Sequence, residues 1–381
     1  MSKLDELINE LCPNGVKYKP LAEVAKISNG KDHKHLDDGK IPVYGSGGIM
    51  RYANQCIYDQ VSVLIPRKGS IGNIFYVNTP FWTVDTIFYT KIDFDQINAR
   101  FFFHYLLTQN IEHLNTAGGV PSLTKAVLDK IEIPLPPLPV QEEIVRILDN
   151  FTELTAELTA ELTARKKQYE YYRDSLFTFD DAKFEWKQLG DIGEVRMCKR
   201  ILKEQTSDKG DIPFYKIGTF GKKPNAYISR ELFYEYKSKY TYPKIGEVLL
   251  SASGTIGRAV IFDGEDAYFQ DSNIVWIEND QTQVLNKYLF YFYKIAKWYI
   301  AEGGTIQRLY NDNLRKTSIP IPYPNDVDQS IKEQQRIVGI LDRFDTLCND
   351  ISTGLPAEIA ARQKQYEYYR NKLLTFKEKL S

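Results

Sequence analysis

The chain has 381 residues, of which 43% are hydrophobic, so it is long enough for two or three domains that each bury a core. Its net charge of −1 excludes neither nucleic acid nor protein partners. Residues 16–138 hold 13 basic and 11 acidic residues, residues 183–326 hold 21 and 18, and residues 139–182 hold 5 and 10. A polyanion would therefore meet the two outer blocks and avoid the acidic one, unless these small imbalances only serve solubility.

No metal, disulfide or membrane feature stands out. The four cysteines are scattered singly without a C-x-x-C pair, so neither a zinc site nor a disulfide framework is expected. His33 and His35 form an H-x-H pair without an acidic or thiol partner at ligand spacing, and we predict no metal and no cofactor. No apolar stretch approaches the roughly 18 residues of a membrane helix, and the first residues lack a signal sequence. We expect a protein of the reducing cytoplasm with no membrane contact.

The first predicted domain covers residues 1–138 and opens with a short helix over residues 2–11. β-branched and aromatic runs follow, such as those at 61–66 and 73–77, and Gly and Asn separate them, as is typical of strands. An aromatic stretch at 98–115 has helical character. These features predict an α+β domain with a compact mixed sheet.

A first spacer helix is predicted for residues 139–182, after the proline-rich run IEIPLPPLP at 131–139. Residues 153–164 read ELTAELTAELTA, a tetrapeptide repeated three times, and its period of four is one helical turn plus ~40°. Residues at alternating steps of four and three indicate a coiled-coil seam. The seam residues are Ile144, Leu148, Phe151, Thr155, Leu158, Leu162, Arg165, Tyr169, Tyr172 and Leu176.

The second half repeats this order, with a globular block at 183–326 and a second spacer helix at 327–381. The block has strand-like runs at 248–253 and 274–278, an aromatic helical stretch at 285–302 and a proline-rich SIPIPYP at 318–324. Its spacer has four more residues than the first, which is a stutter, and Gly354-Leu355-Pro356 predicts a kink or break. The predicted seam is Ile337, Leu341, Phe344, Cys348, Ile351, Leu355, Ile359, Arg362, Tyr366, Tyr369 and Leu373.

The two halves are an internal duplication. RKKQYEYYRDSLFTF at 165–179 answers RQKQYEYYRNKLLTF at 362–376, and QEEIVRILDNF at 141–151 answers QQRIVGILDRF at 334–344. The globular blocks match only loosely, for example in Gly118-Gly119 and Gly303-Gly304. We infer two domains of one fold with different specificities, related by a pseudo-twofold repeat and separated by two long helices that form an antiparallel coiled coil. The alternative is that each seam packs only on its own domain.

Motifs for catalysis are absent from the sequence. No N-P-P-F-type tetrapeptide and no cofactor loop of a methyltransferase occurs, and no phosphate loop of the form G-x-x-x-x-G-K-[ST] is present. The glycine-rich run at 45–48 lacks the strand–helix context of a dinucleotide site, so a turn is the favoured interpretation. We therefore predict a binding protein that is not an enzyme.

Loops that mix Gly, Lys and base-reading side chains are predicted to contact DNA. Arg67 and Lys68 lie on a turn after a strand, and Gln307 and Arg308 suit adenine and guanine edges. For any one residue, a solvated surface group is an equally good interpretation. The first domain contributes Lys31, Lys34, Tyr44, Ser46, Arg51, Arg67, Lys68, Ser70, Asn73, Ser122, Thr124 and Lys125. The second contributes Lys199, Arg200, Lys216, Thr219, Lys222, Lys223, Ser253, Thr255, Arg258, Gln307, Arg308 and Tyr310.

The order of variable and shared segments resembles the specificity subunits of type I restriction–modification enzymes. The resemblance covers nearly the whole chain and rests on LDELINELCPNGVKYKPLAEV at 4–24, IPLPPLPVQEEIVRILDNFTEL at 133–154 and GGTIQRLYNDNLRKTSIPIP at 303–322. It implies two target-recognition domains that each read half of a split double-stranded DNA site. It also implies a coiled coil that fixes the gap and docks two methylation subunits, with motor–nuclease subunits joining them. Methylation, ATP use and cleavage would belong to these partners.

One departure and two alternatives accompany this resemblance. The four extra residues of the second spacer leave open how equally the two domains are presented to DNA. A coiled-coil scaffold with two adhesive β-rich heads is the rival function. The shared QYEYYR segments are predicted to bind the partners, although their tyrosines would also fill the seam. The predicted docking residues are Gln168, Tyr169, Glu170, Arg173, Gln365, Tyr366, Glu367 and Arg370.

Overall fold

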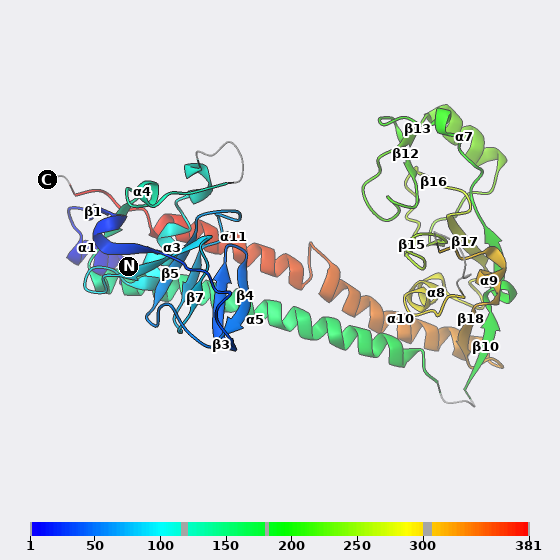
Figure 1. Ribbon diagram of the computed structural model, residues 1–381. Coiled ribbons are helices and arrows are strands. Elements are labelled where there is room, and N and C mark those ends of the chain that lie inside the picture. The colour runs from blue at the N-terminus through cyan, green and yellow to red at the C-terminus, as the bar shows by residue number, and fades with distance from the viewer. Residues whose placement is uncertain (1, 116–120, 180–182, 300–306, 380–381) are drawn as a thin grey trace. The chain divides into compact units, whose positions relative to one another are not determined.

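The computed structural model describes residues 2–115, 121–179, 183–299 and 307–379, and its chain forms two compact units (Figure 1). Unit 1 comprises residues 1–160 and 357–381, and unit 2 comprises residues 161–356. Each unit holds one sheet-rich domain and parts of the long helices. The predicted α+β class with two sheet-rich domains is confirmed. The two Gly-Gly pairs of the duplication lie outside the described residues.

Unit 1 contains three small sheets. Its strands are β1 (Lys17–Pro20), β2 (Ala25–Asn29), β3 (Asp38–Gly45), β4 (Gly48–Ala53), β5 (Ser62–Pro66), β6 (Phe75–Val77), β7 (Trp82–Thr83), β8 (Ile87–Ile92) and β9 (Glu132–Leu135). Its helices are α1 (Lys3–Leu11), α2 (Leu21–Val24), α3 (Ala99–Leu106), η1 (Ile111–Leu114), α4 (Lys125–Leu128), α5 (Leu138–Leu176, shared with unit 2) and α11 (Leu355–Leu373). The strands pair in the orders β2-β8-β5-β6, β4-β3-β7 and β1-β9. The central strand β5 is buried along its whole length, because SVLIP has no charged residue to expose.

Unit 2 repeats this plan. Its strands are β10 (Phe184–Gln188), β11 (Gly193–Arg196), β12 (Ile212–Tyr215), β13 (Tyr227–Ile228), β14 (Val248–Ser251), β15 (Ala259–Ile261), β16 (Tyr268–Phe269), β17 (Ile274–Asn279) and β18 (Ser318–Pro322). Its helices are α6 (Leu189–Ile192), η2 (Lys203–Gln205), α7 (Arg230–Lys239), α8 (Asn286–Tyr293), α9 (Asn311–Lys316) and α10 (Val327–Asn349). The orders β11-β17-β14-β15, β13-β12-β16 and β10-β18 match those of unit 1 strand for strand.

The match extends to strand direction. β3 pairs with β7 in parallel, as β12 does with β16, whereas the other strand pairs are antiparallel. Both proline-rich runs form strands, β9 and β18, that lead directly toward a long helix. The helix α7 follows β13 in unit 2, where the corresponding part of unit 1 has no described helix. The one-fold interpretation of the duplication is therefore confirmed.

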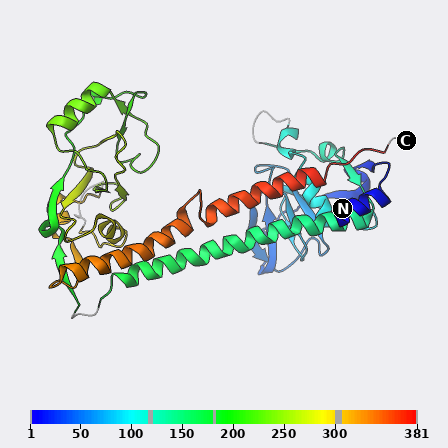
Figure 2. The ribbon, with the colours of Figure 1, turned by 180° about the vertical axis from the view of Figure 1, so that it is seen from behind.

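The long helix α5 has 39 residues and is continuous through the ELTA repeat. In unit 1 it runs antiparallel to α11, and Phe151 stacks on Tyr369. In unit 2 it runs antiparallel to α10, and Tyr172 stacks on Phe344 (Figures 1 and 2). Among the described helices, none is both long enough and apolar enough to cross a membrane. Between residues 153 and 168 the partly shielded residues are those of the predicted seam, namely Thr155, Leu158, Leu162 and Arg165.

The second spacer is broken into α10 and α11, as the Gly-Leu-Pro sequence predicts (Figure 2). The carboxylate of Asp350 accepts hydrogen bonds from the backbone N–H and the hydroxyl of Ser352, at 2.7 and 2.6 Å, and so stabilises the turn. At Gly354 the backbone passes so close to the end of α10 that an added Cβ would lie 2.4 Å from the carbonyl oxygen of Thr346. The prediction that Ile351 belongs to the seam is wrong: it lies in this turn and is 86% exposed.

The aromatic helices are shorter than the sequence predicts. α3 ends at Leu106, and Asn110 adopts a positive φ of 45°, which an α-helix does not tolerate. α8 ends at Tyr293. Beyond it, Trp298 packs against Gly257, where an added Cβ would lie only 2.5 Å from the Trp298 Nε1 atom. Tertiary packing thus overrides the helical pattern of the later aromatic residues.

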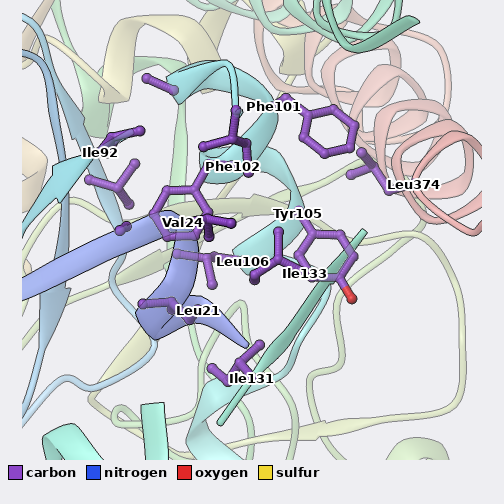
Figure 3. Packing of buried hydrophobic residues seen from close by; sticks show 14 of the residues in the cluster. Leu21, Val24, Ile92, Phe101, Phe102, Tyr105, Leu106, Ile131, Ile133 and Leu374 are labelled. Carbon is purple, nitrogen blue, oxygen red and sulfur yellow. The ribbon is translucent and has the colours of Figure 1, made fainter. Parts of the chain in front are cut away.

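The helices complete the hydrophobic core of each unit. In unit 1, Ile144 and Leu148 of α5 are fully buried in the same cluster as Tyr366 and Leu374. Figure 3 shows Phe101 of α3 pointing toward Leu374, which follows α11 directly. In unit 2 the corresponding cluster joins residues of α10, such as Ile337 and Leu341, with Tyr169 and Phe177. The seam therefore packs on the partner helix and on the domain core together.

Two glycines of the second spacer test the helix break. Gly354→Ala should destabilise the chain by about 1–3 kcal/mol, because the new methyl group overlaps backbone carbonyl oxygens. Gly339→Ala, within α10, should stabilise it by about 0.5–1 kcal/mol, because nothing lies within 4 Å of its Cβ and alanine favours helix. Thermal unfolding of both variants measures the difference. Equal midpoints would show that the turn does not need glycine at this position.

Candidate nucleic-acid interface

In unit 1, three segments meet beyond the end of β5. The backbone N–H of Arg67 donates to the carbonyl oxygen of Thr86 at 2.9 Å, and that of Leu123 donates to the carbonyl oxygen of Arg67 at 2.8 Å. Lys68 and Ser122 form an isolated antiparallel bridge. The loop after β5, the entry to β8 and the segment before α4 are therefore held together by backbone hydrogen bonds.

Unit 2 has the same arrangement at the corresponding positions. The N–H of Ala252 donates to the carbonyl oxygen of Asn273, and the N–H of Leu309 donates to the carbonyl oxygen of Ala252, both at 2.8 Å. Ser253 and Arg308 form the isolated bridge that corresponds to Lys68 and Ser122. We call the three-segment arrangement in each unit the loop platform, and the two platforms share their backbone bonds.

The side chains on the two platforms differ in charge and position. In unit 1 the cations lie on the loop after the strand: Lys68 is exposed, and the Arg67 guanidinium lies 5.2 Å from the Phe88 ring centre. The Nε of Arg67 has no hydrogen-bond partner among the described residues. In unit 2 the cation comes from the returning segment, where Arg308 donates to Oδ1 of Asn273 at 3.0 Å. The two platforms therefore present unlike chemistry from one scaffold.

The glycine-rich run of unit 1 forms the β3–β4 turn beside its platform, which confirms the turn interpretation. Asn73 Nδ2 donates to the carbonyl oxygen of Ser46 at 3.2 Å, and Gly69, at φ +78°, leaves only 3.2 Å between an added Cβ and Ser46 Oγ. A hollow next to this turn is lined by Lys34, Ser46 and Thr86. The predicted residues that gather here are Lys34, Ser46, Arg67, Lys68, Ser70, Asn73 and Ser122, with exposed Thr124 and Lys125 following at α4.

The platform of unit 2 has a neighbouring turn formed by Lys216 and Thr219. The Thr219 hydroxyl accepts a hydrogen bond from the Lys216 backbone N–H at 3.2 Å, and a Cβ on Gly254 would lie 3.6 Å from Ile217 in this turn. Of the predicted residues of unit 2, those that are exposed on the platform or the neighbouring turn are Lys216, Thr255, Gln307 and Tyr310, while Thr219 and Arg308 are half-buried; Lys222 and Lys223 are exposed in the segment that follows the turn.

Some predicted contact residues have other structural roles. The Tyr44 ring packs against Phe75 and Phe81. Ser253 is buried and donates to Asn273 Oδ1 at 2.8 Å, so its hydroxyl serves the platform itself.

The remaining predicted cations fall into two groups. Arg51 is paired with Asp38 and Arg200 with Asp271, and Arg258 donates to the Phe220 carbonyl oxygen at 2.9 Å. Lys31 and Lys199 are exposed, with the Lys199 ammonium 5.2 Å from the Tyr240 ring centre. The three arginines, which are engaged by other groups, are weaker choices for DNA contact than the exposed platform residues.

Sequence reasoning missed Thr86 and Asn273, which precede β8 and β17. Their carbonyl oxygens accept the equivalent backbone bonds of the two platforms, and Asn273 Oδ1 also accepts from Ser253 and Arg308. Neither residue carries a charge or lies in a glycine-rich run, so no local pattern marks it. Aligning the two halves around the strands that follow would have pointed to both.

The shared QYEYYR segments present a mixed surface. Tyr169 and Tyr366 are 8% and 6% exposed and lie in the two cores, which supports the seam interpretation for these rings. Burial raises the pKa of Tyr169 to about 12. Tyr171 and Tyr368, which were not predicted as contacts, are 69% and 60% exposed. Of the other predicted docking residues, Gln168, Glu170, Gln365 and Glu367 are exposed, and Arg173 and Arg370 are half-buried.

Two duplicated domains with matching loop platforms on long paired helices define a two-headed binding protein. The comparison with known protein families gives the same class. The chain belongs to the family of the type I restriction modification DNA specificity domain, whose model matches residues 13–165 and 182–361. The resemblance noted in the sequence is confirmed, and the adhesive scaffold is not favoured.

Particular relatives match over nearly the whole chain. A putative type I restriction enzyme specificity subunit of Haemophilus influenzae is 54% identical over 95% of this chain and 96% of its own length. The specificity subunit of the Escherichia coli type I restriction enzyme EcoR124I/EcoR124II is 32% identical over 99% of this chain and 97% of its own length.

Solved structures share the fold. The S subunit of a type I restriction–modification system from M. genitalium aligns with a TM-score of 0.56 at 15% identity, over 94% of this chain and 96% of that one. A chain from a structure of complex assembly and conformational transition of the type I R-M system aligns with a TM-score of 0.58 at 15% identity. The alignment covers 95% of this chain and 98% of that one. At this identity the likeness shows the fold alone.

Proposed function

We propose that this chain is the non-catalytic subunit of a type I restriction–modification complex that reads a two-part sequence in double-stranded DNA. Each domain reads one half-site through its loop platform. The observation that carries the proposal is that the two platforms keep two equivalent backbone hydrogen bonds and an equivalent bridge while their side chains differ. A scaffold of constant geometry with changed donors and acceptors is what reading two different base sequences requires.

The catalytic steps belong to partners in this proposal. Two methylation subunits bind the paired helices and transfer the methyl group, and motor–nuclease subunits use ATP and cut DNA. Two equivalent partners need two equivalent surfaces, and the QYEYYR segments supply a repeated set of exposed side chains. The complex acts in the cytoplasm, where the free thiols of this chain stay reduced.

The platform arginines provide the test of DNA reading. Arg67→Ala should weaken one half-site and Arg308→Ala the other, each by about 1–3 kcal/mol and specifically at one base pair if the guanidinium contacts a guanine edge. If the contact is to phosphate, binding should weaken for all sequences and the salt dependence should decrease. Binding titrations of the chain assembled with its methylation partner, on oligonucleotides with single base changes, measure both quantities.

Lys26→Ala is the matched control, because Lys26 is an exposed cation on β2 of the same domain as Arg67. It should leave both half-sites unchanged. Unaltered affinity in the two arginine variants would remove these residues from the site. Binding that ignores sequence in the unmodified complex would favour a scaffold instead.

Partner docking is tested by charge reversal. Glu170→Lys and Glu367→Lys place a cation in each exposed QYEYYR surface, and we expect loss of co-purification with the methylation subunit at unchanged thermal stability. Glu153→Lys, at an exposed position of the same long helix, is the control and should assemble normally. Normal assembly of the double QYEYYR variant would locate docking elsewhere.

The ELTA repeat is proposed to set the gap between the half-sites. Deleting one unit removes ~6 Å of helix and rotates the following part by ~40°, whereas one DNA base pair rises ~3.4 Å. The repeat is fully helical, so a shorter repeat shortens a continuous element. We expect methylated sites with a changed gap and identical half-sites. Sequencing the methylated sites of one-unit deletion and insertion variants measures this, and an unchanged gap in an active variant would show that bending absorbs the length.

A further inference from the structure

A polar cluster links the aromatic helix of unit 1 to both long helices. Asp149 of α5 accepts hydrogen bonds from Arg100, whose Nε lies 3.1 Å from each carboxylate oxygen. His104 is fully buried, with Nε2 2.8 Å from Asp149 Oδ1 and Nδ1 2.9 Å from the Tyr366 hydroxyl of α11. One side chain of α3 therefore touches α5 and α11 at the same time.

The protonation states follow from the geometry. Burial lowers the pKa of His104, which Asp149 only partly offsets, so the ring is neutral. An ionised carboxylate only accepts hydrogen bonds, so Nε2 carries the proton and Nδ1 accepts from the Tyr366 hydroxyl. Burial raises the pKa of Asp149, but hydrogen bonds from His104 and Arg100 outweigh it and keep the carboxyl ionised. The cluster is a directional chain from α11 through α3 to α5.

Unit 2 contains an equivalent cluster. Asp342 of α10 accepts a hydrogen bond from Lys287 Nζ at 2.6 Å and from the Tyr291 hydroxyl at 2.7 Å, both on α8. One turn further, Lys294 lies 3.4 Å from Asp345 Oδ1 and 3.4 Å from the Tyr169 hydroxyl of α5. The domain of unit 2 is therefore also joined to both of its helix segments.

The positions of these residues correspond in the duplication. Asp149 and Asp342 are the acids of ILDNF and ILDRF, and Tyr366 and Tyr169 are the first tyrosines of the two QYEYYR segments. On the aromatic helices, Arg100 answers Lys287, and His104 answers Tyr291. Although those helices have diverged, each keeps a cation and a hydrogen-bonding ring facing the acid.

Apolar packing and polar clusters constrain a domain differently. Hydrophobic burial is non-directional, so apolar packing defines the angle of a domain on its helix pair less sharply than directional hydrogen bonds do. A half-buried carboxylate that accepts from both a cation and a ring of the domain favours one orientation, because a tilt lengthens hydrogen bonds to a charged group. The apolar cores therefore attach each domain to its helices, whereas the carboxylates are suited to fix the angle between the domain and the helices.

We propose that Asp149 and Asp342 are positioning residues that fix the angle of each recognition domain on its helix segments and thereby make the gap between the half-sites strict. The inference deepens the proposed function, on which its DNA readout rests. The two acids act through Arg100, His104, Lys287 and Tyr291. Neither the acids nor these four partners need to touch DNA.

The experiment uses the full chain co-expressed with its methylation subunit, with the methylated sites read by sequencing. Asp149→Asn and Asp342→Asn keep the side-chain shape but remove the charge. We expect unchanged half-sites, with methylation at sites one base pair longer or shorter rising several-fold above the unmodified level. Arg100→Lys, which copies the cation of unit 2, should keep the strict gap. Glu153→Gln, an exposed acid one turn from Asp149, should do the same.

A merely structural role predicts a different result. Reduced methylation with a lowered unfolding midpoint and a strict gap would overturn the proposal, as would full methylation with a strict gap. If the unmodified complex methylates no two-part site, the proposed function fails, and small-angle X-ray scattering of the purified chain then decides the positioning separately. A broader distance distribution in the Asn variants supports it, and an unchanged distribution overturns it.

Discussion

The constraint on which the structure depends is that neither recognition domain completes its own core. Unit 1 needs Tyr366 and Leu374 from near the end of the chain, and unit 2 needs Tyr169 of α5 and Phe177, which directly follows this helix. Each aromatic helix is therefore buried by residues from both halves of the duplication. This shared burial holds the long helices antiparallel in each unit and accounts for the first tyrosine of QYEYYR in both halves.

A constant backbone is what allows the two domains to differ. In each loop platform, main-chain hydrogen bonds hold three segments together without help from the exposed side chains. Exposed side chains such as Lys68 and Gln307 can therefore change identity without altering the fold. The same logic separates stability from recognition, because apolar positions that the two halves share face the helices, whereas the platform side chains that differ between the halves lie beyond the ends of the central strands.

The charges of the acidic first spacer and of the two basic domains also fit a separation of structural and recognition roles. Among the acids of the long helix, Asp149 is engaged with the domain, whereas the three glutamates of the ELTA repeat are exposed. An exposed acidic stretch repels the DNA backbone, which leaves the platforms as the favourable contacts. Under the proposed function, the ELTA repeat sets the gap, whereas Asp149 and Asp342 set the domain angles, so each property can change without the other.

The sequence by itself determined the duplication, the α+β class, the long helices, the break at Gly354 and the family, because periodicity, proline and repeated motifs are local signals. Only the tertiary structure decided which predicted contacts gather in space: it brought Lys68 to Ser122 and Ser253 to Arg308, placed Tyr44 against the core, and revealed Asn273. It also ended the aromatic helices early and exposed Ile351. These outcomes depend on backbone bonds and packing between residues far apart in the chain, which no local pattern records.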